Sequence, residues 1–116
     1  MNILFFGDSN THAYSECKSH VERHPGLMID TTFWFLLETA LDEDLYTKVV
    51  ICIGSNHAGA TKDELTALYD SIQAYTKVII VGPHGDIDTR NLETVDGVHY
   101  SESAKNVISK KLKLYF

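Results

Sequence analysis

The sequence has few cysteines and fewer basic than acidic residues, and both facts limit the classes of site and partner to expect. The two cysteines, Cys17 and Cys52, are far apart, and Cys52 falls within an apolar run, so neither a disulfide framework nor a zinc site is indicated. Ten Lys and Arg stand against sixteen Asp and Glu, which leaves a formal net charge of -6. Since an acidic surface repels phosphate groups, we expect no nucleic acid and no anionic membrane among the partners.

Long hydrophobic segments are also missing. The chain opens with MNILFF, has no basic residue there, and turns polar at Gly7-Asp8-Ser9. A signal peptide needs a basic start and a longer apolar segment, and a membrane-spanning helix needs about 20 apolar residues. We therefore expect neither feature, and we expect a cytoplasmic protein whose cysteines stay reduced.

Short apolar runs alternate with amphipathic segments along the chain. The runs are rich in Val and Ile and apolar on both faces, which is typical of parallel strands covered on both sides; they are residues 2–6, 48–53 and 77–82. The amphipathic segments place apolar residues at helical spacings; they are residues 31–45, 61–75 and 101–114. Thr61 with Glu64 and, further on, Ser101 are the expected N-caps. The alternation predicts a single α/β domain over residues 1–116, a three-layer α/β/α sandwich with a small parallel sheet.

Polar, glycine-containing clusters follow the three predicted strands. They are Gly7-Asp8-Ser9, Gly54-Ser55-Asn56-His57 and Gly82-Pro83-His84-Gly85. Sites in open parallel sheets lie at the carboxyl ends of the strands, so the three clusters should converge on one edge. The connections 10–29 and 83–99 are long for so short a chain, which is typical of functional loops.

Ser9 is a candidate nucleophile because it directly follows a buried strand. A serine hydroxyl becomes nucleophilic when a base accepts its proton, and His99 offers an imidazole near the other end of the chain. Asp96, three residues before His99, can hold the Nδ1 proton of that imidazole and leave Nε2 free for Ser9. The amide of Asn56 and the N–H of Ser9 are candidate donors to an oxyanion.

Each of these residues also has a structural interpretation. Ser9 could cap a turn, Asp96 and His99 could form a surface turn before the last helix, and Asn56 could be a turn residue. A metal site is a further alternative, drawing on Asp8, His57, His84, Asp96 and His99. None of their spacings is a recognised ligand pattern, so we expect no metal and no cofactor.

Three blocks of the chain carry a family resemblance. FGDSNTHAY resembles the first block of the SGNH, or GDSL-type, hydrolases; IGSNHAG resembles their GTND block; and DGVHYSESA resembles their closing DGVHxS block. The blocks occur in the family's order over nearly the whole chain. The resemblance implies a flavodoxin-like fold and hydrolysis of a small carboxylic ester, such as an acyl, aryl or carbohydrate acetyl ester. It also implies that Ser9 is the nucleophile, His99 the base, Asp96 its partner and Asn56 an oxyanion donor.

The chain departs from the family pattern in its second block. The best counterpart of the family's GLNGRTT is Gly26-Leu27-Met28-Ile29-Asp30-Thr31-Thr32, which puts Ile29 where the oxyanion-hole glycine would stand. A β-branched residue cannot easily take a positive φ and would crowd the oxyanion, so Gly26 is the alternative donor. His57 replaces the aspartate of GTND. We expect Asp8, His57, His84 and Trp34 to line the substrate site, with Asp8 also ordering the turn at Ser9 through backbone hydrogen bonds.

The chain is also much shorter than is usual for the family. Between Ser9 and Gly26 there is no room for the helix and strand that normally precede the second block. The first strand is therefore expected at the edge of the sheet, and an exposed apolar edge invites a homodimer or a covering loop there.

The sequence leaves three functions open. The first is a serine esterase that acts through Ser9, His99 and Asp96 and an acyl-enzyme. The second is a reduced SGNH-like domain that binds a small ligand or assembles with a partner, with little catalysis, which the presence of Ile29 favours. The third is metal-dependent hydrolysis.

Overall fold

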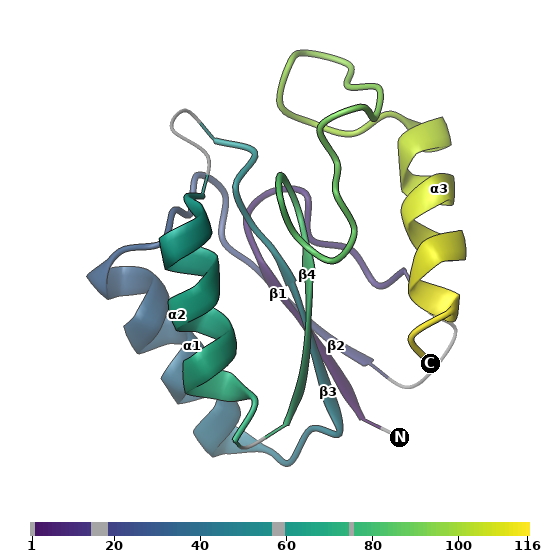
Figure 1. The fold of residues 1–116 in the computed structure, drawn as a ribbon. Helices are drawn as coiled ribbons and strands as arrows, with labels where there is room; N and C mark the ends of the chain where they lie inside the picture. The colour runs from purple at the N-terminus through teal and green to yellow at the C-terminus, as the bar shows by residue number, and fades with distance from the viewer. Residues whose placement is uncertain (1, 15–18, 57–59, 75) are drawn as a thin grey trace.

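The computed structural model describes residues 2–14, 19–56, 60–74 and 76–116 (Figure 1). These ranges contain a parallel sheet with the strand order β2-β1-β3-β4. Its strands are β1 (Ile3–Gly7), β2 (Ser19–Arg23), β3 (Lys48–Cys52) and β4 (Lys77–Val81). The helices are α1 (Thr31–Glu43), α2 (Lys62–Ile72) and α3 (Glu102–Lys113). The predicted α/β class, with a small all-parallel sheet, is confirmed.

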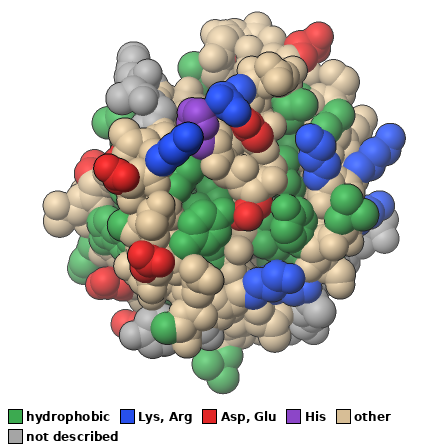
Figure 2. Space-filling view, in the orientation of Figure 1, with side chains coloured by type: hydrophobic (Ala, Val, Ile, Leu, Met, Phe, Trp, Pro, Cys, Tyr) green, Lys and Arg blue, Asp and Glu red, His purple; other side chains and the backbone are tan. Residues whose placement is uncertain are grey.

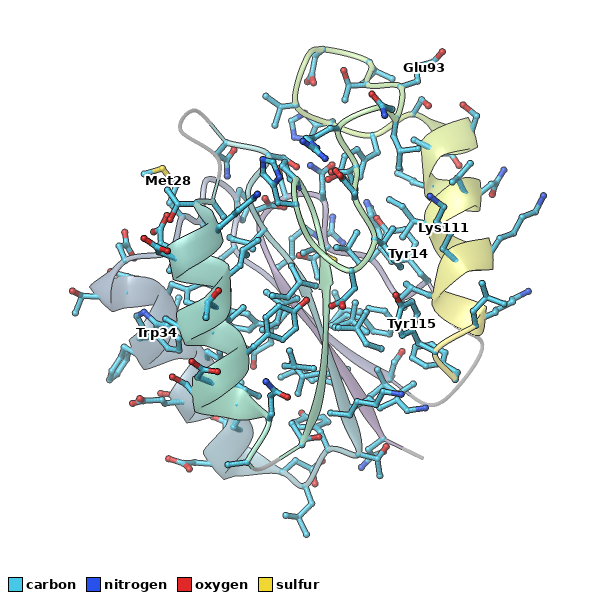
Figure 3. The ribbon with its side chains drawn as sticks, viewed as in Figure 1. Tyr14, Met28, Trp34, Glu93, Lys111 and Tyr115 are labelled. Atoms are coloured by element: carbon cyan, nitrogen blue, oxygen red, sulfur yellow. The ribbon has the colours of Figure 1, made fainter. Side chains whose placement is uncertain are left out.

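The strands bury side chains on both faces, and each face supports its own core. In β1, Leu4 and Phe6 pack with the buried residues of α1 and α2, whereas Ile3 and Phe5 pack with those of α3. Figure 1 accordingly shows α1 and α2 on one side of the sheet and α3 on the other. In Figure 3, Trp34 lies on the α1 and α2 side. The near-continuous apolar strands of the sequence thus reflect burial on both faces.

Side-chain caps begin all three helices. Thr61 and Glu64 form the predicted capping box at the start of α2, and the side chain of Ser101 accepts the N–H of Ala104 at the start of α3. Asp30 caps α1 by accepting the N–H of Phe33 at 3.0 Å. The predicted N-caps are therefore confirmed, because a polar side chain satisfies N–H groups that the first turn leaves unpaired.

The predicted edge position of the first strand is wrong. Residues Ser19–Arg23 form β2, which pairs in parallel with β1, and β3 pairs with the other side of β1. The sequence of β2, SHVER, contains one apolar residue, so it lacks the apolar run that marked the other strands. Because both sides of β1 are already hydrogen-bonded, a homodimer cannot form by pairing through β1.

Basic side chains gather on α3. Lys110, Lys111 and Lys113 lie in its last turn, where the helix dipole favours cations. In Figure 2, blue side chains appear on the right, over this helix. None of the helices in the described ranges is long and apolar enough to span a membrane.

Candidate functional site

The turn that carries Ser9 is fixed to the end of the neighbouring strand. β1 ends at Gly7, where an added Cβ would lie 1.9 Å from the carbonyl oxygen of Cys52. Only glycine allows this approach, after which Asp8 donates its N–H to the same oxygen at 2.9 Å. Thr11 then donates its N–H to the carbonyl of Asp8 at 3.1 Å, which closes the turn around Ser9.

The carboxylate of Asp8 is an internal brace of this turn. It accepts the N–H of Asn10 at 2.9 Å, and the residue is 1% exposed. Burial raises the pKa of Asp8 to about 6, although the N–H groups of Asn10 and Ser55 and the nearby His99 act in the opposite direction. The prediction that Asp8 orders the turn is confirmed. Its side chain is buried beneath the turn, and a role in lining a substrate site stays a prediction.

Ser9, His99 and Asp96 form one hydrogen-bonded chain. Ser9 Oγ lies 3.0 Å from His99 Nε2, and His99 Nδ1 lies 2.5 Å from Asp96 Oδ2. The other oxygen of Asp96 accepts the N–H groups of His99 at 2.7 Å and of Val98 at 3.0 Å. Hydrogen bonds from the backbone and ring of His99, with that from Val98, lower the pKa of Asp96 to about 2.

The three side chains have the geometry for transfer of a proton from Ser9 to His99. Since Asp96 is a carboxylate at neutral pH, it can only accept, so the proton between it and the ring resides on Nδ1 of His99. Nε2 then has a lone pair directed at the hydroxyl of Ser9. This arrangement can remove a proton from Ser9 Oγ and hold it on the imidazole while Asp96 balances the charge.

Asn10 links the turn that carries Ser9 to the turn that carries Asp96 and His99, and the sequence analysis did not predict this role. Its Nδ2 donates to the carbonyl of Val98 at 2.9 Å, and its Oδ1 accepts the N–H of Tyr100 at 3.1 Å. The side chain, 2% exposed, therefore grips the backbone on both sides of His99. Its position next to Ser9 was the one available signal, because the groups that it binds are backbone atoms that any residue would supply.

Asn56 ties the loop that follows β2 to the site. Its Nδ2 donates to the carbonyl of Leu27 at 3.0 Å, which uses one of the two N–H bonds of the amide. The backbone N–H of Ser9 meets no acceptor among the described residues. Both groups are thus able to donate a further hydrogen bond at this edge of the sheet.

Gly26, rather than Ile29, takes the left-handed conformation in the second-block loop. Gly26 has φ +80°, whereas Ile29 is not among the described residues with positive φ. The side chain of Ile29 packs against the core beneath α1 and α2. The expected strain of a β-branched residue in left-handed geometry at position 29 is therefore absent.

Among the further predicted lining residues, His84 and Trp34 make no described contact with Ser9 or His99. His57 lies outside the described residues. His84 is exposed, has φ +65° and directs its N–H toward Asp88, so no described contact joins it to Ser9 or His99. Trp34 lines a groove between α1 and α2 that extends to Tyr46 and Thr76, which precede β3 and β4. That groove reaches the amino ends of the strands, and no described contact joins Trp34 to Ser9 or His99, so a role of Trp34 in lining a substrate site stays a prediction.

No metal centre is found among the described residues, and the comparisons with known proteins find no relative. In the described part of the chain, no group of three or more His, Cys, Asp or Glu is arranged to hold a metal ion. No family model, no curated protein and no solved structure matches the chain.

Proposed function

We propose that this chain is a serine esterase of the SGNH type that hydrolyses a small carboxylic ester. The observation that carries the proposal is the 3.0 Å contact between Ser9 Oγ and His99 Nε2, made by residues 90 positions apart and backed by Asp96. A turn that merely capped a helix would need neither the imidazole nor its carboxylate. The resemblance of all three sequence blocks to the family supports the same interpretation.

The reaction would proceed in two steps. His99 removes the proton of Ser9 as Oγ attacks the ester carbonyl, and it then gives that proton to the leaving alcohol as the acyl C–O bond breaks. Water attacks the acyl-enzyme next, giving a proton to His99 and its hydroxyl to the acyl carbon. The bond between the acyl carbon and Ser9 Oγ then breaks, His99 returns the proton to Oγ, and the acyl group leaves as a carboxylic acid. Asp96 holds the ring in the required tautomer throughout.

Backbone and amide donors would stabilise the negative oxygen formed in each step. We assign this role to the N–H of Ser9, the unused N–H of Asn56 and the backbone N–H of Gly26. The left-handed Gly26 lies next to Leu27, whose carbonyl Asn56 binds, so the loop and the amide are held as one unit. Losing one such donor typically costs about 10²–10³ in turnover.

The topology of the sheet supports a flavodoxin-like, three-layer version of the fold. The order β2-β1-β3-β4 matches the first four positions of the flavodoxin-like order 2-1-3-4-5. In such sheets ligands bind where the strand order reverses, here between β1 and β3. Ser9 follows β1, and its turn is hydrogen-bonded to the last residue of β3.

A ligand-binding or assembly domain with little catalysis is the second candidate. The engagement of the Asn56 amide with Leu27 favours it, since this contact could hold the amide away from an oxyanion. The half-exposed side chains of Asp96 and His99 also favour it, because water competes for a hydrogen bond at so exposed a position.

Hydrolysis of p-nitrophenyl acetate distinguishes the two candidates. The esterase predicts that Ser9→Ala reduces the rate to background and that His99→Ala lowers kcat by about 10³-fold or more. Ser71→Ala and His20→Ala, both at exposed positions, are the matched controls and should retain the wild-type rate. Equal rates in Ser9→Ala and wild type would refute the proposal, and a folded wild type without activity would favour the second candidate.

A further inference from the structure

A shallow pocket lies beside the turn that carries Asp96 and His99. It has a volume of about 260 Å³ and sits at the carboxyl ends of β3 and β4. Its walls come from Ser55 after β3, from Thr89 and Arg90 in the loop after β4, and from Val98 and Tyr100. Segments far apart in the sequence thus enclose one small space at the functional edge of the sheet.

Hydroxyl groups form a connected row in this wall. Tyr100 Oη donates to Thr89 Oγ1 at 3.0 Å and lies 2.8 Å from Ser55 Oγ. Because the one proton of Tyr100 goes to Thr89, Ser55 must be the donor in the second contact. The hydroxyl proton of Thr89 and the lone pairs of Ser55 then remain for a ligand. The wall therefore offers both a donor and an acceptor, which is the pattern that a hydroxyl group needs.

The charge at the rim of the pocket is already neutralised. Arg90 binds Asp88 through two nitrogens, with Nε to Oδ2 at 2.9 Å and Nη2 to Oδ2 at 2.5 Å. This contact holds the guanidinium in one orientation and cancels its charge, so the rim does not select for an anion. The remaining N–H groups of Arg90 can still donate to a neutral oxygen.

The pocket is lined by the two residues that flank His99 in the sequence. Val98 and Tyr100 flank His99, which must deliver a proton to the leaving oxygen. Tyr100 also donates its backbone N–H to Oδ1 of Asn10, the residue after Ser9, at 3.1 Å. The wall thus includes both sequence neighbours of His99, one of which is hydrogen-bonded to the residue after Ser9.

We propose that this pocket, lined by Ser55, Thr89, Arg90 and Tyr100, binds the leaving alcohol of the ester and selects a compact, uncharged alcohol that carries further hydroxyl groups. The proposal rests on the esterase function above and adds the substrate class to it. A site built to bond a hydroxyl discriminates against the analogue without one, because its own polar groups would then be buried unpaired.

A matched pair of esters tests this selection. Glycerol 1-acetate and propyl acetate share the acyl group and the three-carbon alcohol and differ in the two hydroxyls. We expect wild type to favour the glycerol ester by about tenfold in kcat/KM, after division by the ratio of their hydroxide-catalysed rates, as two net hydrogen bonds would give. Thr89→Val should reduce this ratio toward one, Thr89→Ser should retain it, and Thr66→Val on the exposed face of α2 is the control.

Labelling of Ser9 with a fluorophosphonate, measured on the same samples, separates the two proposals. If wild type is labelled but shows no preference for the glycerol ester, the pocket assignment is wrong and the esterase stands. If wild type is folded and neither labelled nor active, the esterase proposal fails and the pocket assignment fails with it. Should Thr89→Val not fold, Ser55→Ala removes the other end of the hydroxyl row and carries the same expectation. A preference that survives both substitutions would overturn the assignment.

Discussion

Ser9 stands on a turn whose neighbours are almost wholly buried, whereas Asp96 and His99 lie on a turn whose side chains are about half exposed. Asp8, Asn10 and Thr11 are each no more than 2% exposed, but the side chains of Asp96 and His99 are 51% and 48% exposed. The first turn is part of the sheet and inherits its rigidity. The second is organised by its own hydrogen bonds, in which one carboxylate accepts two backbone N–H groups and the ring.

Asn10 is the link between these two regions. Its backbone belongs to the buried turn, and its side chain grips the exposed one on both sides of His99. The strands therefore determine the position of the serine, whereas a local turn, held against them in part by the Asn10 amide, determines that of the histidine. The two regions should respond differently to substitution.

The largest effect is expected where a glycine of the buried turn is replaced. Gly7→Ala puts a Cβ 1.9 Å from a backbone oxygen and should lower the free energy of unfolding by about 3 kcal/mol or more. Gly97→Ala, in the exposed turn, has φ +87° but no atom within 4 Å of the new Cβ, and should cost about 1 kcal/mol. Urea unfolding of both variants measures the difference. Equal losses would show that the two turns are equally constrained.

A smaller change in the free energy of unfolding is expected when the buried Asp8 of this turn is replaced, and this change depends on pH. The folded-state pKa of Asp8, about 6, lies above the ordinary value of 3.8, so the fold favours its protonated form. Its contribution to stability is fully present below pH 3.8 and is lost as the pH rises through about 6. Asp8→Asn removes this loss, so the stability of the variant relative to wild type should increase by about 3 kcal/mol between pH 3.5 and pH 7.5.

Unfolding by urea at those two pH values measures the Asp8 effect. The exposed Asp70→Asn substitution on α2 is the matched control. A relative stability of Asp8→Asn that does not change with pH would contradict the assignment of a buried carboxyl with a raised pKa.

The smallest of these effects, a loss of turnover, is expected when Asn10 is replaced. Asn10→Ala releases the backbone on both sides of His99, and a displacement of about 1 Å in a catalytic group can cost about 10²-fold in rate. We expect that loss in kcat, with KM nearly unchanged, under conditions in which circular dichroism shows the variant to be folded. Asn106→Ala, exposed on α3, is the control. A change in KM alone would assign Asn10 to ligand binding instead of positioning.

The elements that the sequence predicted are those whose signal is local. The strands β1, β3 and β4 carry apolar runs, and Thr61 and Ser101 stand at helix starts, so pattern and capping chemistry suffice to find them. β2 was not predicted, because an edge strand of the sequence SHVER has few apolar side chains to bury. It becomes a strand by pairing with β1, a long-range contact that no local pattern reports.

The candidate site divides in the same way. The short spacing of Asp96 and His99 predicted a carboxylate that orients the imidazole, and the resemblance of three sequence blocks to the family predicted the contact with Ser9. The roles of Asn10 and of the hydroxyl row from Ser55 to Thr89 depend on tertiary contacts between distant segments. The expectation for Trp34 likewise depends on tertiary packing, since its side chain lines a groove with Tyr46 and Thr76 and makes no described contact with Ser9 or His99.

Reaction with a fluorophosphonate, followed by intact mass, tests the central claim most directly. An activated Ser9 predicts one adduct per wild-type chain, no adduct on Ser9→Ala and strongly slowed labelling of His99→Ala, while the exposed Ser71→Ala control is labelled like wild type. A folded wild type that gains no mass, or an adduct that persists on Ser9→Ala, would contradict the account.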